Sequence, residues 1–164
     1  MRKQKGFSLI ELLIVVAIIL IIAAIAIPNL LRARIAANES SAVASVRTVN
    51  TAEVAYNSAY PTVGFSANLA TLTGTCTGTV VPTSTSACLI DTVLGGGTKS
   101  GYSFVEANYG GGTPAGAYET DASPITPNQT GVRYFCSNAD AVVRYGAAAF
   151  TGSGNCTTAG TPLQ

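Results

Sequence analysis

Apolar residues are distributed unevenly along this chain, and its first thirty positions hold the densest stretch. Leu12 to Ile27 is an unbroken run of sixteen apolar residues, with a lone carboxylate, Glu11, directly before it. A helix over Phe7–Ile27 would be about 32 Å long at ~1.5 Å per residue, which matches a hydrocarbon core of roughly 30 Å. The pattern therefore predicts a hydrophobic membrane-spanning helix over residues 7–28.

After Pro28 the pattern becomes one-sided. Apolar residues recur at the three-, four- and seven-residue spacings of a single helix face. They are Ile35, Ala42, Val46, Val49, Tyr56 and Tyr60. Residues 29–60 are therefore predicted to be an amphipathic half of the same helix, which runs from Ser8 to about Ala59. Pro61 follows as a stop, because the residue before a proline disfavours helical dihedrals.

Pro28 lies at the boundary between these two halves. Its ring removes one backbone hydrogen bond and crowds the carbonyl of Ala24, four residues earlier. We therefore predict a kink in the helix at Pro28.

The remainder, residues 61–164, is rich in Pro, Gly, Ser and Thr, with short runs of aromatic and β-branched residues. Three of these runs, Tyr102–Glu106, Val132–Cys136 and Ala141–Tyr145, are typical of strands. The turn residues of Ser137–Asp140 predict a hairpin between the last two. The expected fold class is α+β: a long N-terminal helix packed against a small antiparallel sheet that forms a globular domain.

Charge sets the orientation of the apolar segment. Arg2, Lys3 and Lys5 precede it, so the positive-inside tendency places the N-terminus in the cytoplasm and residues 61–164 outside.

Glu11 needs a separate explanation, because an ionised carboxylate at membrane depth costs several kcal/mol unless it is paired. The small residue Gly6 precedes the apolar run, whereas a secretory signal is cut after its apolar core. Cleavage at Gly6 would therefore leave the helix in the mature protein.

The segment Gly6-Phe7-Ser8-Leu9-Ile10-Glu11, followed by the apolar run and Pro28, resembles the N-terminus of type IV pilins and type II secretion pseudopilins. The resemblance is dense over Lys5–Arg34 and falls away beyond about Tyr60. It implies a leader, residues 1–6, that a prepilin peptidase cuts between Gly6 and Phe7. It also implies that the same enzyme methylates the new amino terminus at Phe7.

The resemblance further implies storage in the inner membrane as a single-pass protein, followed by polymerisation with copies of itself into an extracellular pilus or a periplasmic filament. Pilus or secretion machinery would assist. Glu11 would then neutralise the amine of Phe7 on an adjacent subunit. The preferred function is a type IV pilus-like filament subunit, and the alternative is a pseudopilin of a type II secretion system. Some pilins carry a helix-weakening glycine before the proline; the absence of glycine between Phe7 and Ile27 argues against extensive melting.

The four cysteines all follow the apolar segment, in the part expected outside the cytoplasm, where an even number favours disulfides. Three connectivities are possible. We favour Cys76–Cys88 and Cys136–Cys156, because each pair closes a local loop in a stretch with few packing residues. Family members often have a disulfide near the C-terminus, a place that Cys136–Cys156 fits. A zinc site is not expected, since zinc cysteines come in pairs two to four residues apart.

Composition argues against catalysis and nucleic-acid binding. The chain has no histidine, the commonest general base and metal ligand, so we expect neither an enzyme nor a cofactor. Loss of the leader leaves six basic against eight acidic side chains, and no basic face predicts nucleic-acid binding. A membrane-anchored enzyme or binding module is a further alternative, and the lack of a recognisable set of catalytic residues in the sequence argues against it. A plain single-pass anchor would need neither Glu11 nor the Gly6–Phe7 junction.

A calcium-binding loop is an alternative for the middle of the globular part. Glu119 and Asp121 lie close together in the sequence, with Asn108 and Asn128 nearby, and calcium binds oxygen ligands of these types. Two carboxylates in a Gly-rich loop are more often a solvated turn. We therefore predict no metal.

Overall fold

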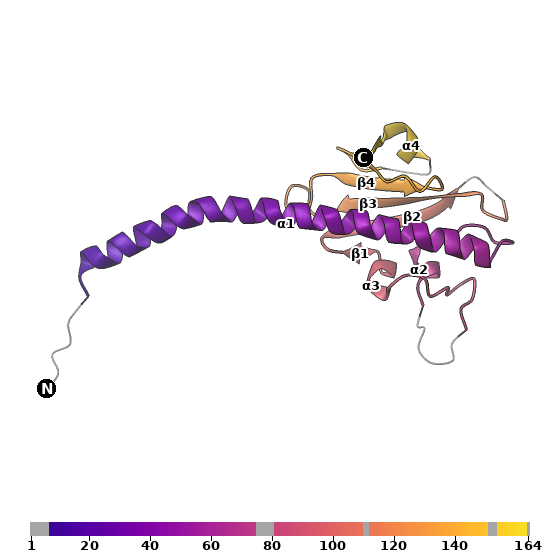
Figure 1. Cartoon of the computed structure of the whole chain (residues 1–164), viewed down its shortest axis with the longest axis horizontal. Coiled ribbons are helices and arrows are strands. Elements are labelled where there is room, and N and C mark those ends of the chain that lie inside the picture. The colour runs from indigo at the N-terminus through magenta and orange to yellow at the C-terminus, as the bar shows by residue number, and fades with distance from the viewer. Residues whose placement is uncertain (1–6, 75–80, 110–111, 151–153, 164) are drawn as a thin grey trace. The chain divides into compact units, whose positions relative to one another are not determined.

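Helix α1, Leu9–Ala59, is the longest element of the protein, with 51 residues (Figure 1). The structure is a computed structural model that describes residues 7–74, 81–109, 112–150 and 154–163. Contacts divide the chain into two compact units, Met1–Arg34 and Ile35–Gln164. The predicted helix is confirmed, including its end before Tyr60, and it stays helical through Pro28. The kink at Pro28 remains a prediction.

The second unit contains an antiparallel sheet of six strands among the described residues. Its strands are β1 (Thr98–Lys99), β2 (Tyr102–Tyr109), β3 (Ala117–Pro124), β4 (Tyr134–Asn138), β5 (Arg144–Gly146) and β6 (Thr161–Pro162), in that spatial order. Three short helices accompany it: α2 (Leu69–Leu72), α3 (Thr92–Gly95) and α4 (Asn155–Ala159). The predicted α+β class, a long helix with a small antiparallel sheet, is confirmed.

The sequence predicted some strands better than others. The predicted strand Tyr102–Glu106 is part of β2, and the predicted hairpin is the β4–β5 pair. The turn was placed too early, because Ser137 and Asn138 belong to β4 and the chain reverses after them. Strand β3 was missed, because its residues are mostly small or polar and carry no β-branched apolar residue.

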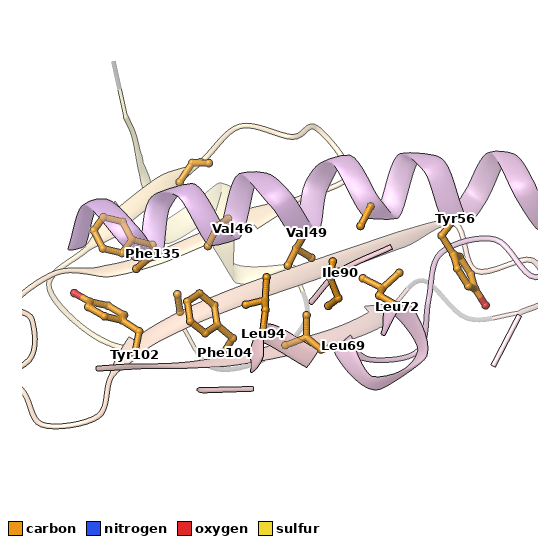
Figure 2. Packing of buried hydrophobic residues seen from close by; sticks show 14 of the residues in the cluster. Val46, Val49, Tyr56, Leu69, Leu72, Ile90, Leu94, Tyr102, Phe104 and Phe135 are labelled. Carbon is orange, nitrogen blue, oxygen red and sulfur yellow. The ribbon is translucent and has the colours of Figure 1, made fainter. Parts of the chain in front are cut away.

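One face of the sheet packs against the second half of α1, and this interface is the main core (Figure 2). Ala42, Val46, Val49 and Tyr56, four members of the predicted stripe, are all buried. They pack against residues of the sheet and of the short helices α2 and α3. These include Leu72, Leu94, Tyr102, Phe104 and Phe135. Each large apolar side chain buried in this way stabilises the fold by roughly 1.5–3 kcal/mol.

A buried polar chain crosses the same interface and fixes how the elements align. The Tyr118 hydroxyl donates to Asn50 Oδ1 at 3.0 Å, and Asn50 Nδ2 donates to Ser137 Oγ at 2.9 Å. These residues come from β3, α1 and β4 in turn. A slip of any of the three elements would leave buried polar groups unpaired, at about 1–3 kcal/mol each.

Candidate functional site: the N-terminal helix and the C-terminal disulfide

The start of α1 is capped by the side chain of Glu11. Helix α1 begins at Leu9, and the Ser8 backbone N–H donates to Glu11 Oε2 at 3.2 Å. This contact is half of a capping box, in which a glutamate at the third helical position satisfies an otherwise unpaired N–H. Sequence reasoning missed the role, although the spacing Ser8-Leu9-Ile10-Glu11 is its signature. Within a single chain, Glu11 therefore already has a partner close to Phe7.

Residues 7–31 present exposed apolar side chains around the first part of α1. Phe7 is 77% exposed and Leu9 78%, and the large apolar side chains from Ile10 to Leu31 are also exposed in the single chain. Within the described residues, α1 is long and apolar enough to cross a membrane. A helix that is hydrophobic all round needs an apolar environment, either lipid or other helices. Gly6, the predicted cleavage residue, lies outside the described residues, so the predicted Gly6–Phe7 junction stays a prediction.

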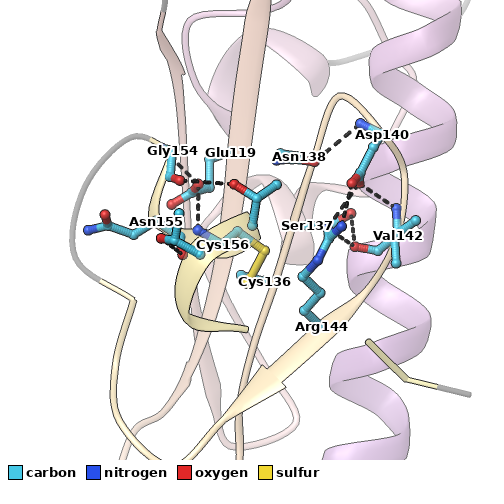
Figure 3. Close-up of a disulfide and its surroundings, with 12 residues drawn as sticks. Glu119, Cys136, Ser137, Asn138, Asp140, Val142, Arg144, Gly154, Asn155 and Cys156 are labelled. Carbon is cyan, nitrogen blue, oxygen red and sulfur yellow. Dashed lines mark hydrogen bonds and ion pairs between the residues drawn. A yellow bond between two sulfur atoms is a disulfide. The ribbon is translucent and has the colours of Figure 1, made fainter. Parts of the chain in front are cut away.

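The C-terminal part contains the disulfide Cys136–Cys156, as the sequence predicted, with the two Cα atoms 5.7 Å apart (Figure 3). It joins strand β4 to the short helix α4. Both cysteines are fully buried and form a small second cluster with Phe150, separate from the main core. Cys88 is also disulfide-bonded, but its predicted partner, Cys76, lies outside the described residues.

Glu119 and Asp121 do not form the solvated turn that the sequence predicted. Both belong to strand β3, where Glu119 is only 3% exposed. Glu119 Oε2 accepts the backbone N–H groups of Gly154 at 2.9 Å and Cys156 at 3.1 Å (Figure 3). The carboxylate thus holds the start of α4 beside the disulfide. The missed signal was the period of two between the residues, which places both on one face of a strand.

The calcium hypothesis finds no support in this arrangement. Asn108 is in β2 and Asn128 lies in the segment between β3 and β4, and no set of three acidic, cysteine or histidine side chains suited to a metal is found in the described part of the chain. Burial, and then the charge of Glu119, raise the pKa of Asp121 to about 7. Both effects favour uptake of a proton by Asp121.

Comparisons with known proteins agree with the features of the N-terminal helix. The family model described as the prokaryotic N-terminal methylation motif matches residues 1–27. The chain is 68% identical over 40 residues to the type IV wide pilus major component PilA4 of Thermus thermophilus. These 40 residues are 24% of this chain and 30% of that protein. It is 45% identical over 54 residues to the type IV major pilin protein PilA of Myxococcus xanthus, 33% of this chain and 24% of that one.

A third relative belongs to a secretion system. The type II secretion system core protein G of Vibrio cholerae is 42% identical over 65 residues, which are 38% of this chain and 44% of that protein. The chain therefore matches less than half the length of each of these relatives. No solved structure matches the chain at a significant level.

The chain has a prepilin-type N-terminus, as the methylation motif and the capped apolar helix indicate. An antiparallel sheet packs beside the second half of that helix. Over its first 27 residues the chain matches the N-terminal methylation motif, and over stretches of 40 to 65 residues it is similar to type IV pilins and to a type II secretion core protein.

Proposed function

We propose that the chain is a structural subunit of a type IV pilus-like filament, cut by a prepilin peptidase and polymerised through α1. The observation that carries the proposal is the exposed apolar stretch Phe7–Leu31, which includes the first part of α1 and overlaps the N-terminal methylation motif of residues 1–27. Before assembly, this helix anchors the chain in the inner membrane, and the second unit lies outside the cytoplasm. The role is structural and not enzymatic.

The mechanism rests on an exchange of apolar surroundings. In the membrane, lipid tails cover the side chains of Phe7–Leu31, whereas in the filament the helices of neighbouring subunits cover them. Because both environments are apolar, extraction from the membrane costs little hydrophobic free energy. Polymerisation then needs a specific contact, and Glu11 supplies it by pairing with the amine that cleavage creates at Phe7 of an adjacent subunit.

Glu11 therefore has two roles in this proposal. It accepts the Ser8 N–H of its own chain through Oε2, and a carboxylate can accept several hydrogen bonds at once. A neighbouring amine can therefore bind without displacing the helix cap. Removal of one partner of such a buried pair costs about 3–5 kcal/mol, enough to set the register between subunits.

A second candidate function is that of a pseudopilin of a type II secretion system. The observation in its favour is the match to core protein G, which extends over 65 residues and is the longest of the three reported. A pseudopilin would use the same helix and leader in a short periplasmic filament.

The decisive experiment is to shear filaments from source cells and identify their peptides by mass spectrometry. Peptides of residues 102–124 in long surface filaments, and their loss when the gene is deleted, would support the pilus. Loss of secretion with no change in surface filaments would favour the pseudopilin. A chain found only as a monomer in the membrane would contradict both.

A further inference from the structure

Two buried glutamates from distant parts of the chain lie side by side between α1 and the sheet. Glu53 on α1 is fully buried, and Glu106 on β2 is 5% exposed. Both carboxyl groups bind the same residue, Ser66, which brings them close together. Two ionised carboxylates have no hydrogen to share, so a hydrogen bond between them would require a proton on one of them.

Ser66, in the segment between α1 and α2, joins both acids. Its backbone N–H donates to Glu53 Oε2 at 3.0 Å, and its hydroxyl donates to Glu106 Oε1 at 2.6 Å. The other two oxygens, Glu53 Oε1 and Glu106 Oε2, are buried and have no hydrogen-bond partner of their own. A proton on one of the two carboxyl groups would supply the donor that this pair of acids lacks.

The surroundings offer no positive charge to replace that proton. In the part of the chain that the structure describes, none of the ion pairs involves Glu53 or Glu106. The titratable side chains close to the two acids are Tyr56 on α1 and Tyr118 on β3. Burial first, and then the charge of Glu53, raise the pKa of both, and the charge of Glu106 adds to the effect on Tyr118. Across the sheet, Glu106 is the register partner of Thr120, a neutral residue.

We infer that Glu53 and Glu106 hold one proton between them and act as a proton-dependent latch that joins α1, β2 and the Ser66 segment. With the proton, the latch has one negative charge and a complete set of hydrogen bonds. Without it, two like charges are buried in contact, and the attachment of β2 and the Ser66 segment to α1 weakens. The latch lies within the second unit and is independent of the proposed filament function.

The surroundings of Glu106 favour its protonated form. Burial first, then the hydrogen bond to Glu53 and its charge, raise the pKa of Glu106 to about 10, against a smaller opposing effect of Ser66. The unfolded chain would release this proton near the ordinary value of 4.5. Between these values the folded state binds a proton that the unfolded state lacks, so stability falls as pH rises through the window.

A cavity of about 330 Å³ opens beside α2 and α3, and Glu106 is among its lining residues, together with Asn68 and the glycines of 95–97. The oxygens Glu53 Oε1 and Glu106 Oε2 themselves are buried.

The test is infrared spectroscopy of the full-length chain in detergent micelles at about pH 8.5, between the pKa values of Asp121, about 7, and Glu106, about 10. We expect the carbonyl band of one protonated carboxyl group per chain, lost in Glu106→Gln and retained in the control Asp121→Asn. Absence of the band in the wild-type chain, or its persistence in Glu106→Gln, would overturn the inference.

A second measurement does not depend on assigning the band. Thermal unfolding from about pH 6 to 10 should show a midpoint that falls more steeply with pH in the wild-type chain than in Glu106→Gln, whose amide can donate to Glu53 without titrating. Parallel profiles would contradict the latch. The same unfolding measurement is repeated with added calcium. If calcium raises the midpoint of the wild-type chain but not that of Glu106→Gln, the two acids form a cation site and do not share a proton.

Discussion

Glu39 and Arg133 are 94 positions apart in the sequence. The carboxylate of Glu39 binds both the backbone N–H and the side chain of Arg133. Glu39 Oε1 accepts the Arg133 backbone N–H at 3.1 Å, and Oε2 accepts Nε at 2.8 Å and lies 2.7 Å from a terminal guanidinium nitrogen. The guanidinium also lies over the rings of Phe135 and Tyr145. This contact fixes the start of β4 to α1.

Glu39→Ala should therefore destabilise the second unit by about 1.5–3 kcal/mol, the range for hydrogen bonds to a charged group. Urea unfolding of the full-length chain in detergent would measure it. The control is Arg47→Gln, an exposed position on the same helix, which should change stability by less than about 0.5 kcal/mol. Equal effects of the two changes would contradict a specific role for Glu39.

The same contact predicts sensitivity to acid. Burial alone would raise the pKa of Glu39, but hydrogen bonds from Val132 and Arg133, with the charge of Arg133, lower it below its ordinary value of 4.5. Because the folded-state pKa is lowered, the stabilisation is present above pH 4.5 and is lost as pH falls through the folded-state value. The difference in stability between wild type and Glu39→Gln should shrink in acid, and urea unfolding at a series of pH values would measure it.

Asp121 predicts the opposite dependence. Its folded-state pKa, about 7, lies above the ordinary 3.8, so its contribution is most favourable below pH 3.8 and is lost as pH rises to about 7. Asp121→Asn should raise the unfolding midpoint at about pH 8 more than at about pH 5. Thermal unfolding at the two pH values tests this, and an equal change at both would be inconsistent with a raised pKa.

Loss of the disulfide should damage folding and spare insertion. The Cys136→Ser, Cys156→Ser double variant should lose about 2–5 kcal/mol, as is usual for small extracytoplasmic domains. The chain should still enter the membrane, because α1 is unchanged, but should be degraded faster. Pulse-labelling separates synthesis from decay. Non-reducing peptide mapping of the wild type would also identify the partner of Cys88, which we predict to be Cys76.

The mature amino terminus should be Phe7, and it should be methylated. Intact-mass analysis of protein from source cells decides this. A chain beginning at Met1, or anywhere after Ile27, would contradict processing at Gly6. Replacement of Gly6 by a bulky residue should leave the uncut precursor in the membrane.

Substitutions of Glu11 can separate its two roles. Glu11→Gln can still cap the helix, since glutamine serves at this position of a capping box, but it lacks the charge that would pair with an amine. Glu11→Leu lacks both. If pairing governs assembly, both variants should be cut and accumulate in the membrane without forming filaments alone. Sheared-filament yield against the membrane pool measures this. Abundant filaments of Glu11→Leu alone would rule out the pairing.

The sequence predicted the elements that apolar periodicity marks and missed those held by polar contacts. The stripe from Ala42 to Tyr56 is visible because burial on a helix repeats every three or four residues. Glu53 and Glu106 are core residues that no hydropathy pattern can identify. Both bind Ser66, which is 13 positions from the first and 40 from the second, so their burial depends on how the folded chain brings three segments together.

Strand β3 illustrates the same limit. The face of β3 that carries Glu119 is polar, and Glu119 on it accepts the N–H groups of Gly154 and Cys156. The folded chain brings these groups together across more than thirty residues. At the N-terminus, by contrast, the capping partners Ser8 and Glu11 are three residues apart, so the local sequence alone contains all that is needed to predict their contact.

The two ends of the sheet have a consequence for how copies of the chain can associate. The outermost strands, β1 and β6, have only two residues each, and one carries Lys99 while the other carries Pro162. Short edges with a charge or a residue that lacks an N–H offer few free peptide groups to a foreign strand. Neither of these two outermost strands therefore offers much of a template for adding strand to strand as in amyloid, so ordered association of many copies through them is disfavoured.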